Sequence, residues 1–400
     1  MNILAIETSC DETAIAILSV SGGKNPAFRL RANVVHSQIA IHAPYGGVFP
    51  ALAKREHSRN IVPVLKEALA QGFGISKSKF LISKEFPTSK IKLLTSILER
   101  EPELLKQFLK EIPKIKKPRV DVIAVTHGPG LEPALWVGIN FAKALALVWN
   151  VPVIPVNHME GHLFSSFIRG KEFSISKIQF PMLALLVSGG HTELILIKKW
   201  GQYKKIGETQ DDAAGEAFDK VARMLGLPYP GGPSISALAE IAQKDAERTQ
   251  KNAEMRLPRP MINSKDFNFS FSGLKTAVLY LLRNLSKKHS SVLQNTRIVQ
   301  SIAYEFQEAV VDVLVKKTLD AARKYKTRAI LLGGGVAENE RLRARLTEDV
   351  ARALPNTTLL LPDKSTTTDN AAMIAIAGYF NSLSKKKRPK NIRAQGNLSL

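Results

Sequence analysis

Two stretches of the chain repeat one plan, in which a strand, a polar turn and a second strand follow one another. In the first stretch, the apolar residues 3–6 and 14–20 flank the polar turn 7–13. In the second, the apolar residues 183–187 and 194–197 flank the turn 188–192. Two related hairpins about 180 residues apart predict two lobes of similar design. The 400 residues also exceed the usual size of a single hydrophobic core.

Further strands and helices alternate along the chain. Apolar runs predict strands over 120–125, 153–156 and 329–332, and the last enters the glycines 333–335 before a helical pattern over 339–350. Other helices are expected at 55–70, 135–149, 210–226, 297–325 and 369–383. This alternation indicates an α/β protein with layered sheets and helices.

Composition excludes several classes of protein. Hydrophobic residues make up 44% and charged residues 23%, as in a globular protein. The longest apolar stretch, 183–197, is interrupted by polar residues and is too short to span a membrane. The first residues read directly into a strand without a signal-peptide pattern, so we expect a bacterial cytoplasmic protein. Cys10 is the single cysteine and excludes an intrachain disulfide.

The chain is strongly basic. Lys and Arg number 57 against 35 Asp and Glu, a net charge of +22. Such an excess attracts polyanions, and nucleic acid is favoured over a membrane because no basic amphipathic helix stands out. Residues 75–118 form a Lys-rich insertion with a helical pattern over 92–109. We expect the basic tail 384–400 to be mobile, either as an RNA-touching arm or as a solvated end.

The most informative pair of side chains is His158 and His162. Their spacing places both imidazoles on one face of a helix, at the separation that a metal ion needs. Such a pair also occurs in ordinary helices. Glu160 lies between them, but a zinc protease needs its glutamate directly after the first histidine or directly before the second. Glu160 lies about 200° around the helix from His158, which disfavours a protease.

Three other motifs suit a nucleotide, although each also has a purely structural interpretation. Residues 188–192 form a small-residue turn whose backbone N–H groups could cradle a phosphate. Residues 211–219 hold four carboxylates around a helix start, including Asp219. Residues 229–233 form a rigid Pro/Gly loop.

These motifs together resemble one family closely, the tRNA threonylcarbamoyl-adenosine transferases, formerly labelled O-sialoglycoprotein endopeptidases, of the actin/heat-shock-70/sugar-kinase superfamily. The resemblance implies an actin-like (ribonuclease-H-like) duplicated α/β fold with a ligand cleft between two lobes. The matching runs follow the family's order and lie at residues 6–13, 45–48, 128–131, 157–162, 186–192, 211–220, 229–233, 269–276, 333–336 with Asn339, and 368–374.

The resemblance also implies residue roles. His158, His162 and Asp369 would hold a divalent metal, Fe²⁺ or Zn²⁺. Asp11 and Glu12 would be catalytic and, with Glu7, would face the adenine to be modified. The residues expected to bind threonylcarbamoyl-AMP are Leu186, Val187, Ser188, Gly189, Gly190, Asp219, Gly232, Gly334, Gly335 and Asn339.

The expected lobes are 1–155, carrying the insertion, and 156–368, with the helix 369–383 returning to the first lobe. The expected partners are tRNA, a paralogous inactive subunit and a small P-loop ATPase, or a second copy of the chain. Two alternatives stay open, an ATP-dependent phosphotransferase or ATPase of the same superfamily and a non-catalytic tRNA-binding scaffold. Departures from the family pattern are the long insertion, Glu132-Pro133 after the Gly-Pro-Gly-Leu run, and the missing C-terminal Trp-Pro.

Overall fold

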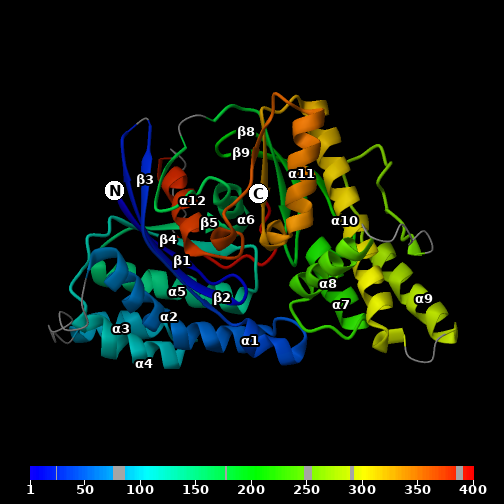
Figure 1. Cartoon of the computed structure of the whole chain (residues 1–400). Coiled ribbons are helices and arrows are strands. Elements are labelled where there is room, and N and C mark those ends of the chain that lie inside the picture. The colour runs from blue at the N-terminus through cyan, green and yellow to red at the C-terminus, as the bar shows by residue number, and fades with distance from the viewer. Residues whose placement is uncertain (24, 75–85, 176–177, 247–254, 289–291, 384–390) are drawn as a thin grey trace. The chain divides into compact units, whose positions relative to one another are not determined.

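The structure is a computed structural model of the chain, and its elements are labelled in Figure 1. It describes residues 1–400 except 24, 75–85, 176–177, 247–254, 289–291 and 384–390. The contacts divide the chain into two compact units. Unit 1 comprises Met1–His42, Val48–Ile178 and Asp369–Leu400. Unit 2 comprises Ala43–Gly47 and Gln179–Thr368.

A six-stranded mixed sheet forms the centre of unit 1, in the order β5-β4-β1-β2-β3-β6. β1 pairs antiparallel with β2 and parallel with β4. β1 and β2 are almost wholly buried, because helices cover both faces and their sequences are therefore continuously apolar. The strands are β1 Asn2–Glu7, β2 Glu12–Ser21, β3 Ala27–Ser37, β4 Val122–Gly128, β5 Val153–Asn157 and β6 Glu172–Ser174.

The helices of unit 1 cover the two faces of this sheet. One face packs against α12, which also contacts α6, and the other packs against α2 and α5 (Figure 1). Side chains of β1 point alternately to the two faces of the sheet. Leu4 and Ile6 belong to the core cluster under α2 and α5. The helices are α1 Ile39–His42, α2 Pro50–Phe73, α3 Thr88–Ile97, α4 Pro102–Glu111, α5 Glu132–Trp149, α6 His158–Ser165 and α12 Ala371–Leu383.

The basic insertion contributes to the core of unit 1. Residues 75–85 lie outside the described part of the chain, and the helical pattern predicted over 92–109 forms two helices, α3 and α4. Pro102 begins the second helix, where its missing N–H leaves no hydrogen bond unmade. Leu94 and Phe108 are fully buried in the same cluster as the sheet residues. The insertion is therefore packed onto the unit through its apolar face.

The end of the chain differs from the mobile tail expected from the sequence. Residues 384–390 lie outside the described part, but the last ten residues contact β4 and the loop after it. The Gln395 N–H donates to the His127 carbonyl at 2.9 Å, and the Gly130 N–H donates to the Gly396 carbonyl at 3.1 Å. Gly128 permits this approach, because a Cβ there would lie 2.0 Å from the Gln395 carbonyl oxygen. Backbone pairing therefore holds this segment without the Trp-Pro motif.

Unit 2 contains a five-stranded sheet in the order β11-β10-β7-β8-β9. Its strands are β7 Met182–Val187, β8 Thr192–Lys199, β9 Gln202–Glu208, β10 Ala329–Gly333 and β11 Thr358–Leu360. Its core gathers alternate residues of β7 with apolar residues of α7 and α10. The helices are α7 Ala214–Met224, α8 Gly231–Ala246, α9 Ser272–Lys288, α10 Thr296–Tyr325 and α11 Glu340–Ala353, with the short 3₁₀ turn η6 Gly335–Glu338 before α11.

The two sheets share one topology, which confirms the predicted duplicated fold. In each, the first three strands form an antiparallel meander, and two later strands add in parallel beside the first (β5-β4-β1-β2-β3 and β11-β10-β7-β8-β9). The division between the units differs from the lobe bounds expected at 155/156. Residues 156–178 belong to unit 1, because α6 packs on α12 and β6 pairs with β3.

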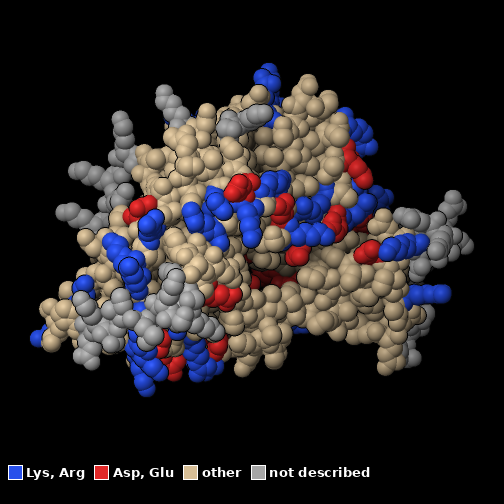
Figure 2. All heavy atoms as spheres, turned by 60° about the vertical axis from the view of Figure 1, so that its left-hand side comes forward, with Lys and Arg blue, Asp and Glu red and all other residues tan. Residues whose placement is uncertain are grey.

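The chain has a net charge of +22. Figure 2 shows Lys and Arg on one face in several groups with Asp and Glu among them. A membrane-spanning helix would need a long, uniformly apolar sequence, and no described helix has one.

Candidate functional site

The two predicted metal-binding histidines lie at the start of α6. Asn157 begins this helix, and its side-chain oxygen accepts the backbone N–H of Met159 at 2.8 Å. His158 and His162 therefore stand one turn apart on the same face, and both are buried. Their Nε2 atoms lie 3.1 Å apart. Local sequence is sufficient to place these two donors.

Asp369 completes a cluster of three donor atoms within unit 1. Its Oδ1 lies 3.4 Å from the Nε2 of His158 and 3.2 Å from that of His162. Asp369 stands just before α12, whose start is capped by Asn370 through the N–H of Met373. Because α12 packs on α6, this distant carboxylate is held beside both imidazoles.

The cluster fits a metal ion. Ligands about 2.0–2.2 Å from one cation are separated from one another by about 3.0–3.5 Å, as these three atoms are. Two ring nitrogens facing each other at 3.1 Å repel unless a proton or a cation lies between them. Among the described residues, this is the one group of three His, Cys, Asp or Glu side chains with donor atoms within 4.8 Å of one another. The group could therefore hold a metal ion.

Electrostatics favour a cation in the same place. Burial lowers the pKa of His162, which keeps that imidazole neutral and able to bind a metal. Burial would also lower the pKa of His158, but the carboxylates of Asp369 and Glu7 outweigh it and raise that pKa well above its usual value. The two carboxylates thus stabilise a positive charge at His158, and either a proton or a metal ion can supply that charge.

Glu7 has a different position from the one expected for it. It was expected to face the substrate adenine, but it is fully buried at the end of β1. Its carboxylate accepts the Ser9 N–H and the Thr126 hydroxyl, each at 2.6 Å, and lies 3.1 Å from the Nδ1 of His158. A carboxylate beside Nδ1 keeps the ring proton on Nδ1. The other nitrogen, Nε2, is then unprotonated and can bind a metal. Glu7 therefore contacts the His158 ring, a position that sequence spacing did not reveal.

Asp11 ends the turn between β1 and β2, and Glu12 is the first residue of β2. Each is only 8% exposed, and Glu12 accepts a hydrogen bond from the Ser37 hydroxyl at 3.3 Å. Burial raises the pKa of Asp11 and, together with the charge of Asp11, raises the pKa of Glu12 well above its usual value. Two close, buried carboxyl groups share a proton, because both cannot easily be charged at once.

In unit 2, the predicted turn after β7 offers backbone instead of side chains. Leu186 and Val187 are fully buried strand residues, main chain included, and the accessible part of this run begins at Ser188. The Ser188 N–H donates to the His191 carbonyl at 2.8 Å and closes the turn. At Gly189 and Gly190, an added Cβ would meet nothing within 4 Å. These two glycines leave open space that the protein itself does not fill.

Other predicted nucleotide residues surround this turn. Gly334, at a φ of +89°, packs so closely that a Cβ would lie 2.3 Å from the Val187 carbonyl oxygen. The following turn η6, which begins with Gly335, contacts both β7 and α7. Gly335 has open space at its Cβ position, as the two glycines of the turn have. The structure thus brings the β7 and β10 motifs together.

Asp219 and Asn339 both hold helix starts. The Asp219 carboxylate accepts the Gly231 N–H at 2.7 Å at the start of α8, beside Gly232, which has open space at its Cβ position. The side-chain oxygen of Asn339 accepts the Leu342 N–H at 2.9 Å, and its side-chain NH2 donates to Ser236 of α8 at 2.9 Å. Both side chains therefore lie beside α8, with much of their hydrogen-bonding capacity already used within the protein.

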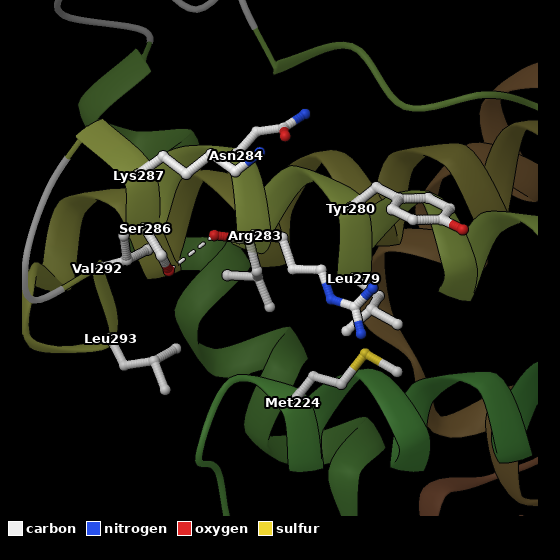
Figure 3. Close-up of a pocket in the computed structure, with 10 residues that line it drawn as sticks. Met224, Leu279, Tyr280, Arg283, Asn284, Ser286, Lys287, Val292 and Leu293 are labelled. Carbon is white, nitrogen blue, oxygen red and sulfur yellow. Dashed lines mark hydrogen bonds between the residues drawn. The ribbon is translucent and has the colours of Figure 1, made fainter.

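A groove in unit 2 lies away from these motifs. It has a volume of about 680 Å³, and Figure 3 shows Tyr280, Arg283 and Lys287 of α9 along it, with Met224 of α7 opposite. None of its lining residues belongs to the predicted site. We therefore place the chemistry at the polar motifs and not in this groove.

Comparisons with known proteins agree with these motifs. Residues 29–79 and 97–376 match the sequence profile of the family described as TsaD, tRNA N6-adenosine threonylcarbamoyltransferase. Proteins of that name from Geobacillus kaustophilus and Bacillus subtilis are each 42% identical to this chain, over 94% of this chain and 90% of theirs. The protein of that name from Chromobacterium violaceum is also 42% identical, over 94% of this chain and 92% of its own.

A solved structure supports the fold alone. A crystal structure of full-length HypF in its phosphate- and nucleotide-bound form is similar over 97% of this chain and 47% of the HypF chain, with a TM-score of 0.53 and 11% identity. The match to the family profile covers most of the chain, and the relatives match nearly its whole length. The chain belongs to the tRNA N6-adenosine threonylcarbamoyltransferase family.

Proposed function

We propose that this protein transfers a threonylcarbamoyl group from threonylcarbamoyl-AMP to N6 of the adenine 3′ to the anticodon, in tRNAs that read codons beginning with A. The observation that carries the proposal is the convergence of His158, His162 and Asp369, with Glu7 behind them, in a member of this family. Superfamily kinases instead bind magnesium through oxygen ligands, so a histidine pair argues for acyl transfer.

The proposed cation is Fe²⁺ or Zn²⁺, because two imidazole nitrogens and one carboxylate suit these metals and leave positions open for substrate. When bound, the metal supplies Lewis-acid stabilisation of charge on phosphate and carbonyl oxygens. Glu7 keeps His158 in the tautomer whose Nε2 points to the site, and Ser9 supports the same ring, with its Oγ 3.2 Å from Nδ1.

Asp11 and Glu12 would handle the proton. The lone pair of N6 forms a bond to the carbamoyl carbon, and the bond from that carbon to the phosphate oxygen breaks, so that AMP leaves with the electron pair. N6 then loses a proton, which the Asp11–Glu12 pair accepts. Burial raises the pKa values of both carboxyl groups, which brings them closer to the pH at which a base works efficiently.

Unit 2 would hold the adenylate through the turn that Leu186, Val187, Ser188, Gly189 and Gly190 form. The open space at Gly189, Gly190, Gly232 and Gly335 supports this proposal, because a ligand can approach the main chain there. Asp219 and the one remaining acceptor position of Asn339 would contact the nucleoside, and Gly334 would keep the two motifs in contact.

The macromolecular substrate would be tRNA, which the net charge of +22 attracts through its phosphates. Its target base must leave the stack to reach a buried centre. The proposed protein partners are a paralogous inactive subunit and a small P-loop ATPase, or a second copy of the chain. A bacterial cytoplasmic location remains a prediction.

The proposal is tested by mass spectrometry of anticodon-loop nucleosides after incubation of the protein with tRNA and threonylcarbamoyl-AMP. The arms are protein as purified, protein stripped with a chelator, and stripped protein reloaded with Fe²⁺ or Zn²⁺. We expect modified adenosine in the first arm, its loss in the second and its return with one metal. Full product from metal-free protein would refute the assignment of the centre.

A further inference from the structure

A chain of buried polar side chains in unit 1 lies behind the turn that carries Asp11 and Glu12. Its members are Gln38, His42 and His57, and all three are fully buried. None of them belongs to the metal centre or to the predicted site. Buried polar groups are retained where their hydrogen bonds are satisfied, so their partners indicate their purpose.

The two ends of this chain are backbone groups, and they fix its direction. The Phe49 N–H can only donate, and it lies 3.3 Å from the Nδ1 of His42. His42 must therefore carry its proton on Nε2, which lies 3.1 Å from the side-chain oxygen of Gln38. The amide nitrogen of Gln38 then faces the Nδ1 of His57 at 3.3 Å.

The far end agrees with this direction. The Cys10 carbonyl can only accept, and the Nε2 of His57 lies 2.9 Å from it. His57 must carry its proton on Nε2, which leaves Nδ1 free to accept from Gln38 and from the Thr13 hydroxyl at 2.8 Å. Burial lowers the pKa of His57 to about 4, in keeping with a neutral ring.

The contact with Cys10 completes a set of three. The carbonyls of Ser9, Cys10 and Asp11 follow one another in the turn, and each accepts a hydrogen bond. The Leu131 N–H holds the first at 2.8 Å, and the Gln38 N–H holds the third at 2.9 Å. Of these three contacts, the one to the middle carbonyl comes from a side chain, that of His57. His57 is thus the point at which a substitution can release the turn.

We propose that His57, kept in one tautomer by Gln38 and His42, is a positioning residue that sets the turn carrying Asp11 and Glu12 for the transfer step. It touches no substrate and acts through the Cys10 carbonyl. The kinetic consequence rests on the function proposed above, whereas the structural consequence does not.

Two substitutions with the same amide group separate positioning from packing. In His57→Gln, the amide reaches the place of Nε2 and can still donate to the Cys10 carbonyl. In His57→Asn, the shorter side chain ends near the place of Nδ1 and cannot reach it. Gln38→Glu keeps the size of the side chain but removes the N–H that donates to the Nδ1 of His57. It therefore disfavours the His57 tautomer with its proton on Nε2. Ser58→Ala is the control, because it breaks one hydrogen bond to the Lys54 carbonyl on the same helix and leaves the contacts among Gln38, His42 and His57 in place.

Cys10 reports on the turn without any assay of activity. It is the single cysteine, so the rate of its alkylation by iodoacetamide measures how often the turn opens. We expect labelling to be severalfold faster in His57→Asn and Gln38→Glu, and close to wild type in His57→Gln and Ser58→Ala. Equal rates in the Asn, Gln and wild-type proteins would overturn the positioning role, whether or not the protein modifies tRNA.

Kinetics supply the second measurement. We expect His57→Asn to lower kcat about tenfold or more with little change in KM, because a misplaced catalytic group affects the reaction more than binding. His57→Gln should recover most of the rate. An unmodified tRNA pool with wild-type protein would refute the proposed function, whereas equal kcat values in the Asn and Gln variants would refute the positioning of the turn.

Discussion

The turn between β1 and β2 in unit 1 and the turn between β7 and β8 in unit 2 hold equivalent places in two sheets of one topology. The first turn and the strand ends beside it carry Glu7, Asp11 and Glu12, whose carboxylates are buried against other side chains. The second carries Gly189 and Gly190, beside which the space is open. The same backbone plan therefore presents side chains in one unit and bare main chain in the other.

Under the proposed function, this difference would divide the tasks of a duplicated fold between the two turns. Buried carboxylates can orient an imidazole and accept a proton, but they would repel a phosphate at close range. Glycines leave backbone N–H groups accessible and suit a phosphate, but they provide no acid or base. On this proposal, a few residues in one turn decide whether the end of a strand pair suits chemistry or binding.

The strongest test of the proposed chemical site in unit 1 is to remove one of the proposed metal ligands. His158→Ala deletes one of three donors, and we expect metal binding and transfer activity to fall at least roughly 100-fold. Metal content by mass spectrometry and nucleoside analysis measure the two effects. His36→Ala, at an exposed histidine of β3, is the control. Wild-type metal content in the His158→Ala protein would show that His158 is not a metal ligand.

The role of Glu7 gives a smaller effect on the same side. Glu7→Gln keeps size but removes the charge beside the Nδ1 of His158, and we expect metal affinity to weaken about 10- to 100-fold. A competition titration with a chromophoric chelator measures the affinity. Unchanged affinity would show that the Thr126 and Ser9 contacts of Glu7 are purely structural.

The anchoring of the β1–β2 turn predicts a dependence of stability on pH. The pKa of His57 is lowered from 6.5 to about 4 in the folded protein, so between these values the unfolded chain binds the proton more readily. Stability therefore falls as the pH drops from 6.5 toward 4, by roughly 2–3 kcal/mol for this group. Urea unfolding at pH 7 and pH 4.5 measures the loss. His57→Gln should remove most of it, and an identical loss in this variant would contradict the assignment.

Substitution of two glycines tests the proposed binding site in unit 2. Gly334→Ala places a Cβ against the Val187 carbonyl at a positive φ, and we expect a loss of roughly 1–3 kcal/mol of stability. Gly190→Ala meets open space, so stability should change little while the KM for threonylcarbamoyl-AMP rises. Thermal unfolding and steady-state kinetics distinguish the two. An unchanged KM in a folded Gly190→Ala protein would argue against a ligand at this turn.

Sequence patterns were informative wherever a feature is local. The apolar runs around both turns predict β1, β2, β7 and β8, because a central strand buried on both faces must be apolar along its length. The helical pattern over 92–109 was wrong about continuity, since Pro102 starts a new helix there. The composition of the tail gave no sign of its backbone pairing with β4, because main-chain hydrogen bonds leave little trace in side chains.

The amino-acid sequence by itself determined the two hairpins and the common face of His158 and His162, since both follow from the period of a strand or a helix. The family resemblance names Asp369, although nothing in its own spacing marks it as a ligand. Tertiary structure decided that α12 brings Asp369 to the imidazoles, that Glu7 turns inward to orient His158, and that His57 reaches the Cys10 carbonyl. These contacts join residues far apart in the chain, and their geometry depends on how sheet and helices pack.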